Sequence, residues 1–122
     1  MTPESHELVV KHLDDPDDTT SFDNGTLEIV SLGDVTVKRA TVDPEWRWSE
    51  DVAPLMGTDR CESHHTLYIV SGRLRIELND GTEEEGGAGD VMVIPPGHDS
   101  WVVGDNPLVY VDFSCLSPPF GE

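Results

Sequence analysis

Short runs of alternating apolar and polar residues, separated by tight-turn signals, constrain this sequence more than any other feature. The clearest run is Arg73–Leu78. Because successive side chains of a strand point to opposite faces, its alternation places Leu74, Ile76 and Leu78 against a core. Asn79-Asp80-Gly81 follows directly and is a strong hairpin signal, since glycine readily adopts the positive φ of a tight turn. The run and its turn predict a half-buried antiparallel sheet.

The same pattern recurs along most of the chain and predicts an all-β barrel or sandwich. Trp46-Arg47-Trp48 is expected to open one strand, with both indoles on one face, and no helical period is evident after the N-terminal lead. Residues 1–21 are predicted to be an acidic arm, in which 7–13 forms a helical turn, an added strand or a loose segment; residues 22–122 form one barrel domain. The remaining strand candidates are residues 27–31, 35–40, 83–85, 91–94, 101–103 and 108–113.

The chain is strongly acidic, with 25 Asp and Glu against 7 Lys and Arg and a net charge of −18. Self-repulsion of this size is unfavourable at ordinary ionic strength, whereas at molar salt the Debye length falls to roughly 3 Å. We interpret the charge as adaptation to a salt-accumulating, haloarchaeal cytoplasm; disorder and nucleic-acid mimicry are the alternatives. The same charge argues against nucleic-acid or anionic-membrane partners bound through a basic patch.

The cellular compartment is predicted from the signals that the sequence lacks. No apolar run approaches the ~20 residues that a transmembrane helix needs, and the N-terminus has neither the basic nor the apolar region of a signal peptide. Cys61 and Cys115 are too few and too far apart to suggest a disulfide framework. A cytoplasmic, reduced protein is expected.

Two stretches resemble the paired motifs of the cupin superfamily. In the second motif, Gly89, five residues and Pro95-Pro96-Gly97 fit the family pattern without adjustment. In the first, counting back from Gly72 puts His65 at the family's Glu position, with Cys61 and Asp59 at its two His positions. The chain looks most like small, uncharacterised single-domain cupins. The resemblance implies a jelly-roll barrel (a double-stranded β-helix), a divalent transition metal held inside it, and a homodimer by analogy.

The candidate metal ligands are Cys61, His65 and His98, with Asp59 as a fourth. Residues 59, 61 and 65 share one face if this stretch is extended, while the family's second His falls at Ser100, two residues after His98. Thiolate and imidazole favour zinc or a late transition metal, and iron, nickel and manganese remain open. The competing interpretation makes Cys61 a small core residue and His98 the cap of a turn.

A ligand pocket is predicted at the barrel mouth, where small barrels hold ligands. Its candidate residues are Arg47, Trp48, Tyr68, Ser100 and Trp101; ordinary packing and a surface ion pair of Arg47 are the alternatives. Three functions remain open. The chain is a barrel that binds a small molecule, a metal-dependent oxygenase or isomerase acting on a small polar metabolite, or a non-catalytic dimeric sensing or interaction module.

Overall fold

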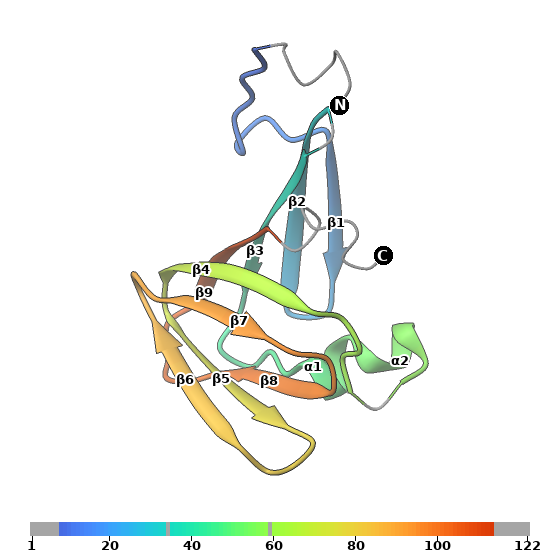
Figure 1. The fold of residues 1–122 in the computed structure, drawn as a ribbon, viewed down its shortest axis with the longest axis vertical. Coiled ribbons are helices and arrows are strands. Elements are labelled where there is room, and N and C mark those ends of the chain that lie inside the picture. The colour runs from blue at the N-terminus through green and yellow to red at the C-terminus, as the bar shows by residue number, and fades with distance from the viewer. Residues whose placement is uncertain (1–7, 34, 59, 114–122) are drawn as a thin grey trace.

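The computed structural model describes residues 8–33, 35–58 and 60–113, and antiparallel strands dominate this part of the chain. A six-stranded sheet has the order β1-β2-β3-β9-β4-β7, and a three-stranded sheet has the order β6-β5-β8 (Figure 1). The strands are β1 (Asp18–Phe22), β2 (Gly25–Leu32), β3 (Val35–Val42), β4 (His65–Ser71), β5 (Arg73–Leu78), β6 (Glu83–Gly87), β7 (Val91–Ile94), β8 (His98–Val102) and β9 (Leu108–Asp112).

The prediction of an all-β chain is confirmed, and so is the orientation of the central strand. Leu74 and Ile76 of β5 are buried, whereas Arg73 is exposed. The β5–β6 hairpin turns at the predicted place, with Gly81 at a φ of 89°. The period-2 pattern therefore identified the core face correctly.

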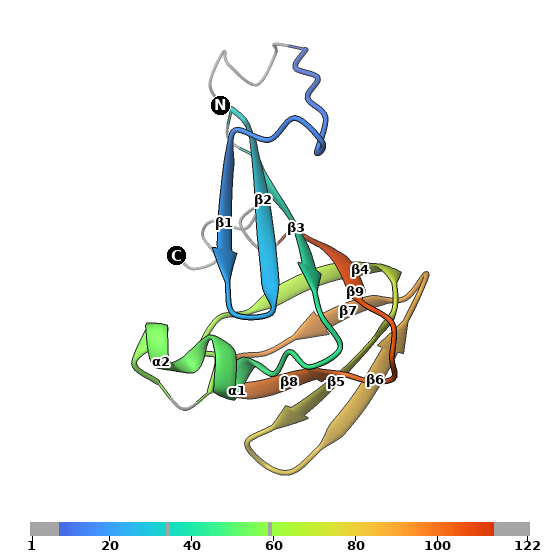
Figure 2. The same ribbon diagram turned by 180° about the vertical axis from the view of Figure 1, so that it is seen from behind.

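The core lies between the two sheets, where the smaller sheet faces β9, β4 and β7 (Figure 1). Strands β1, β2 and β3 rise beyond that layer as a wing, which is seen from behind in Figure 2. Ile69, Leu108 and Val42 are the largest fully buried side chains and come from β4, β9 and β3. Burial of such side chains provides the main stabilisation of the barrel.

The prediction that Trp46-Arg47-Trp48 opens a strand is wrong, as is the expectation of no helix after the lead. Helix α1 (Trp48–Asp51) lies beside β8, and helix α2 (Ala53–Met56) packs against α1 further from the sheet (Figure 2). The Asp51 carboxylate accepts the Arg47 backbone N–H at 3.0 Å, which closes the chain into a turn. Each helix is four residues long, too short to show a helical period.

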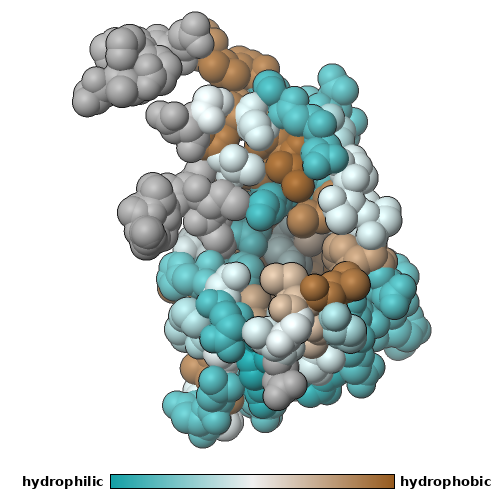
Figure 3. Space-filling view, turned by 90° about the vertical axis from the view of Figure 1, so that its right-hand side faces the viewer, coloured by the Kyte–Doolittle hydropathy of each residue, from teal (hydrophilic) through white to brown (hydrophobic). Residues whose placement is uncertain are grey.

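The acidic lead reaches the large sheet, because β1 begins at Asp18 and pairs with β2. Before it, residues 8–17 contain neither helix nor strand, although ion pairs Lys11–Asp17 and Asp14–Arg39 hold them. Figure 3 shows hydrophobic side chains exposed near the upper end of one side and hydrophilic ones over most of its lower part. Of the helices in the described ranges, none has the length and apolar character needed to cross a bilayer.

Candidate metal centre

Two stretches that are far apart in sequence, residues 61–65 and the start of β8, bring Cys61, His65 and His98 together. His65 opens β4 and His98 opens β8, while Cys61 lies between α2 and β4. An isolated bridge joins Cys61 to β8, with the Cys61 N–H donating to the His98 carbonyl at 2.8 Å and the Gly97 N–H to the Cys61 carbonyl at 2.7 Å. Gly97 has a φ of 86°, so the glycine of the Pro-Pro-Gly turn is needed to direct the chain into this bridge.

The three side chains offer their donor atoms to one point. Cys61 Sγ lies 3.3 Å from His65 Nε2, and the two imidazole rings meet edge to face with centroids 5.3 Å apart. One ligand atom from each residue lies within 4.8 Å of the others. Cys61 and His98 are buried and His65 is partly buried. This arrangement could hold a metal ion.

Each histidine is oriented through its other ring nitrogen. His65 Nδ1 lies 2.9 Å from Asp112 Oδ2, and His98 Nδ1 lies 2.7 Å from the Pro95 carbonyl oxygen. A carbonyl oxygen only accepts, so His98 Nδ1 carries the proton and Nε2 is left for the cluster. In the same way, the Asp112 carboxylate accepts the Nδ1 proton of His65 and leaves the Nε2 atom of that ring for the cluster. Such outer partners fix the tautomer and the ring direction of metal-binding histidines.

Asp112 is the residue of this site that the sequence interpretation missed. It is the last residue of β9, and Leu108 and Asp112 are both buried at alternate positions of that strand. Asp112 pairs with Leu67 of β4, which is also buried. An acidic residue in phase with the core positions of a strand was the available signal, because carboxylates are almost never buried without a partner.

The electrostatics favour a charged pair in the metal-free protein. Burial alone would raise the pKa of the Cys61 thiol, but hydrogen bonds from His65, His98 and the Ser63 N–H lower it to about 6. Burial would lower the pKa of His65, but the bonds to Asp112 and Cys61 raise it to about 9. At neutral pH the pair is therefore a thiolate and an imidazolium. Thiolate is the form that ligates metals.

The register differs from what an extended stretch predicts. Strand β4 begins at His65, so the expectation that the preceding residues continue the same strand is wrong where the chain is described. Cys61 reaches the cluster through its bridge to His98 instead. Ser100, at the family's His position, is buried and pairs with Ile76, one repeat further along β8. Asp59 lies outside the described residues, as does Cys115.

The residues predicted to line a ligand pocket do not gather in one place. Arg47 stacks on Trp101, with its guanidinium carbon 4.3 Å from the ring centroid, and donates through Nε to Asp99 at 2.9 Å. Trp101 alternates along β8 with the inward-facing Ser100 and lies on the opposite face of that strand. Trp48 is buried in the core, and the 41% exposed Tyr68 lies on the outer face of β4.

The comparisons with known proteins establish the fold. No protein-family model and no curated protein sequence matches the chain significantly. Among solved structures, it is similar to a protein of unknown function (DUF1255) from Acidithiobacillus ferrooxidans, with 22% identity over 91% of this chain and 96% of that one and a TM-score of 0.59. It is also similar to a sugar phosphate isomerase of the cupin superfamily from Silicibacter pomeroyi, with 16% identity over 74% of this chain and 58% of that one and a TM-score of 0.54.

A third similar structure is the oxalate decarboxylase of Lactobacillus farciminis, with 22% identity over 83% of this chain and a TM-score of 0.58. The chain spans only 31% of that enzyme's length. Proteins with this fold thus include enzymes of different reactions and a protein of unknown function. The fold here is a cupin barrel. A fold shared at this level of identity does not specify the reaction.

Proposed function

We propose that this chain is a small single-domain cupin that binds a divalent transition metal through Cys61, His65 and His98, and a small molecule beside it. The observation that carries the proposal is the orientation of both imidazoles. Asp112 and the Pro95 carbonyl engage the two Nδ1 atoms, which leaves both Nε2 atoms for a metal beside the Cys61 sulfur. A structural core cysteine would not need two histidines fixed in this way.

The donor set favours zinc over iron, nickel and manganese. One thiolate and two imidazoles form a soft ligand set, and zinc sites that act on substrates use three protein ligands and one open position. Asp59 remains our candidate for a fourth ligand. A metal bound here would supply Lewis-acid chemistry to a ligand such as a carbonyl compound. The chain's own contribution is to orient the imidazoles and to shield the site from bulk water, since Cys61 and His98 are buried.

Whether the bound molecule is turned over separates the two leading hypotheses. An oxygenase or isomerase needs a proton-transfer group. Besides the ligands and Asp112, the described group coupled to Cys61 is the Tyr110 phenol, and burial together with the nearby Asp112 and Cys61 charges raises its pKa, so it stays protonated. Non-catalytic binding or sensing is therefore the reading that we favour. It requires metal and ligand binding without product formation.

Metal analysis of the purified protein tests the proposal. Wild-type protein, isolated in molar salt without chelator, is expected to contain close to one zinc per chain. Cys61→Ala and His65→Ala are each expected to lose it. His12→Ala is the control, because it removes an imidazole that is 75% exposed in the acidic lead. Folded wild-type protein that neither retains zinc nor takes it up would overturn the proposal.

We further propose that two copies associate through the outer face of β4 and β7. Tyr68, Val70, Val91 and Val93 are exposed there without a charged residue between them, in a chain of net charge −18. Two copies can associate about a twofold axis that brings the same apolar face of each together, which is why a second copy fits this face.

Sedimentation measurements test the association. The wild type is expected to sediment as a dimer, and Val91→Lys as a monomer. Val35→Lys adds the same charge at a 39% exposed valine on β3 and is expected to remain dimeric. A monomeric wild type at micromolar concentration would refute the interface.

The acidic composition completes the proposal. We propose that the protein works in a salt-rich cytoplasm of the haloarchaeal kind, where screening relieves the repulsion of 25 acidic residues. Partner preferences follow from the same charge, which disfavours nucleic acids and anionic membranes.

A further inference from the structure

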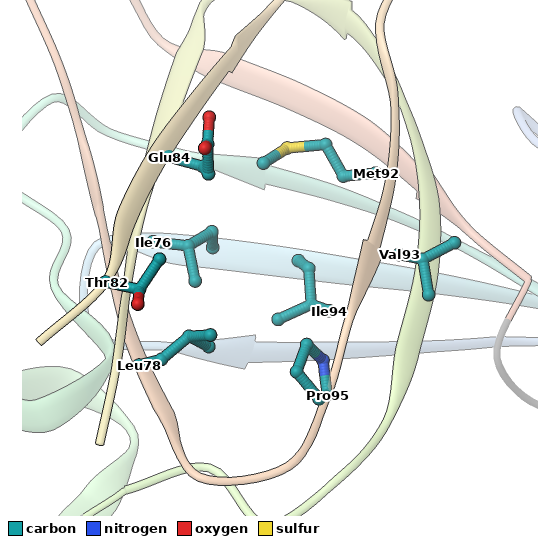
Figure 4. Close-up of a pocket in the computed structure, with 8 residues that line it drawn as sticks. All are labelled: Ile76, Leu78, Thr82, Glu84, Met92, Val93, Ile94 and Pro95. Atoms are coloured by element: carbon teal, nitrogen blue, oxygen red, sulfur yellow. The ribbon is translucent and has the colours of Figure 1, made fainter. Parts of the chain in front are cut away.

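A small cavity opens at the seam between the two sheets, apart from the cysteine–histidine cluster. Its volume is about 80 Å³, and it lies between β5 and β6 on one side and β7 on the other (Figure 4). Its walls are mainly apolar. The residues that matter for its chemistry are Ile76, Leu78, Met92, Ile94, Thr82 and Glu84.

The cavity exists because β6 and β7 are edge strands of different sheets and do not pair with each other. Near the turn that joins them, Met92 closes the seam against Gly86. A Cβ at Gly86 would lie 2.6 Å from the Met92 sulfur, so the close packing there depends on glycine. Further along, the strands separate and Ile76 and Ile94 face each other across the opening (Figure 4).

Glu84 gives this apolar cavity a charged rim. It pairs with Ile76, so both lie on the inner face of the small sheet, whereas Glu83 and Glu85 on the other face bind arginines. The Glu84 carboxylate makes no hydrogen bond or ion pair with any described residue, although the backbone of Glu84 pairs with β5. Figure 4 shows its carboxylate at one end of the cavity, next to Met92. An anionic group above apolar walls is complementary to a cation that carries a short hydrocarbon chain.

We propose that this seam cavity binds a small primary amine, with its alkyl chain between Ile76 and Ile94 and its ammonium group at Glu84. A group the size of a water molecule occupies about 30 Å³, so 80 Å³ accommodates about three carbons of a short alkyl chain, with the next carbon and the head group outside. An alcohol of the same length can fill the space between the apolar walls, but it gains no charge attraction to the Glu84 carboxylate.

The amine site goes beyond the proposed metal function and does not depend on it. Ile94 and Leu78 of the cavity pair directly with His65 and His98, so the cavity and the cluster share one wall. None of the three candidate metal ligands lines the cavity. Cys61→Ala is therefore expected to abolish metal binding and to retain amine binding, which separates failure of one proposal from failure of the other.

The test is an amide chemical-shift titration with n-butylammonium, n-butanol and butyrate at equal ionic strength. In the wild type, we expect saturable shifts in β6 and β7, with n-butylammonium binding at least fivefold more tightly than n-butanol and butyrate most weakly. In Glu84→Gln, this preference over n-butanol is expected to disappear. Glu83→Gln removes the same charge from the opposite face of β6 and is expected to keep the preference.

Two results would overturn the proposal. One is equal affinity of the wild type for n-butylammonium and n-butanol, or shifts confined to residues outside the seam. The other is an unchanged amine preference in Glu84→Gln. If that variant also self-associates, the role of Glu84 is that of an inward charge that protects the β6 edge from pairing.

Discussion

Replacing Asp112 tests the role of the group behind His65. Asp112 is 7% exposed, and its carboxylate accepts from His65 Nδ1 at 2.9 Å. A hydrogen bond to a charged group contributes about 1.5–3 kcal/mol, roughly twice a neutral one. Asp112→Asn keeps a neutral acceptor and is expected to weaken zinc binding by about 1.4 kcal/mol, which is about tenfold. Asp112→Ala removes the acceptor and should weaken zinc binding about a hundredfold, at the upper end for outer partners of metal ligands.

Competition with a chromophoric zinc chelator measures both affinities, and thermal unfolding confirms that each variant is folded. Asp105→Asn is the matched control, because it removes the same charge at an exposed position. In the metal-free protein, the pKa of His65 should also fall from about 9 in both Asp112 variants, since Asp112 is the main group that raises it. Zinc affinities within twofold of wild type in folded Asp112→Asn and Asp112→Ala would refute the orienting role.

Other outcomes follow from the same site and from the charge. In metal-free protein, thiolate absorbance at 240 nm that is lost in Cys61→Ala should titrate near pH 6; a midpoint near the ordinary 9.0 would exclude the charged pair. Because this pKa is lowered on folding, Cys61 contributes stability that is present above pH 9 and is lost as the pH falls through 6, and urea unfolding of Cys61→Ala against pH should show that missing contribution. Gly97→Ala and Gly89→Ala both place alanine at a positive φ, 86° and 91°, and each should cost about 1–2 kcal/mol in urea unfolding. Only Gly97→Ala should also weaken zinc binding, because its Cβ would lie 2.4 Å from Asn79 Nδ2 beside the bridge to His98; equal zinc affinity of the two variants would contradict this. The melting temperature should rise steeply between 0.1 M and molar NaCl, and a constant value would disprove the salt-adaptation proposal.

The residues of the Cys61–His65–His98 cluster were predicted from sequence, but the contacts that hold them were not. Spacing nominated Cys61, His65 and His98, and the structure brings them together. It does so by an unexpected route, since Cys61 is held by a bridge to His98 rather than by a continuous strand. Asp112 is 47 residues from His65 in sequence, and only the pairing of β9 with β4 makes them neighbours.

The pocket residues show a similar limit of prediction from sequence. Arg47 and Trp101 were grouped with Ser100 by their chemistry and by the family position of Ser100. In the structure, Trp101 and Ser100 lie on opposite faces of β8, and Arg47 packs on the outer one. The seam cavity, by contrast, depends on which two edge strands fail to pair, and no local pattern encodes that.

The sequence by itself determined most of the strands, their turns and the core face of β5, because a period of two and a glycine at positive φ are local properties of the backbone. It did not predict β1, which lies largely in the expected arm, and it placed the strand at 101–103 where β8 spans His98–Val102. The two four-residue helices were not predicted, since one helical turn is too short to display a period. Only the tertiary structure decided which strands pair and in what register. That choice sets Asp112 behind His65, His98 against Cys61 and Glu84 over the seam, because contacts between distant segments depend on the packing of the whole barrel.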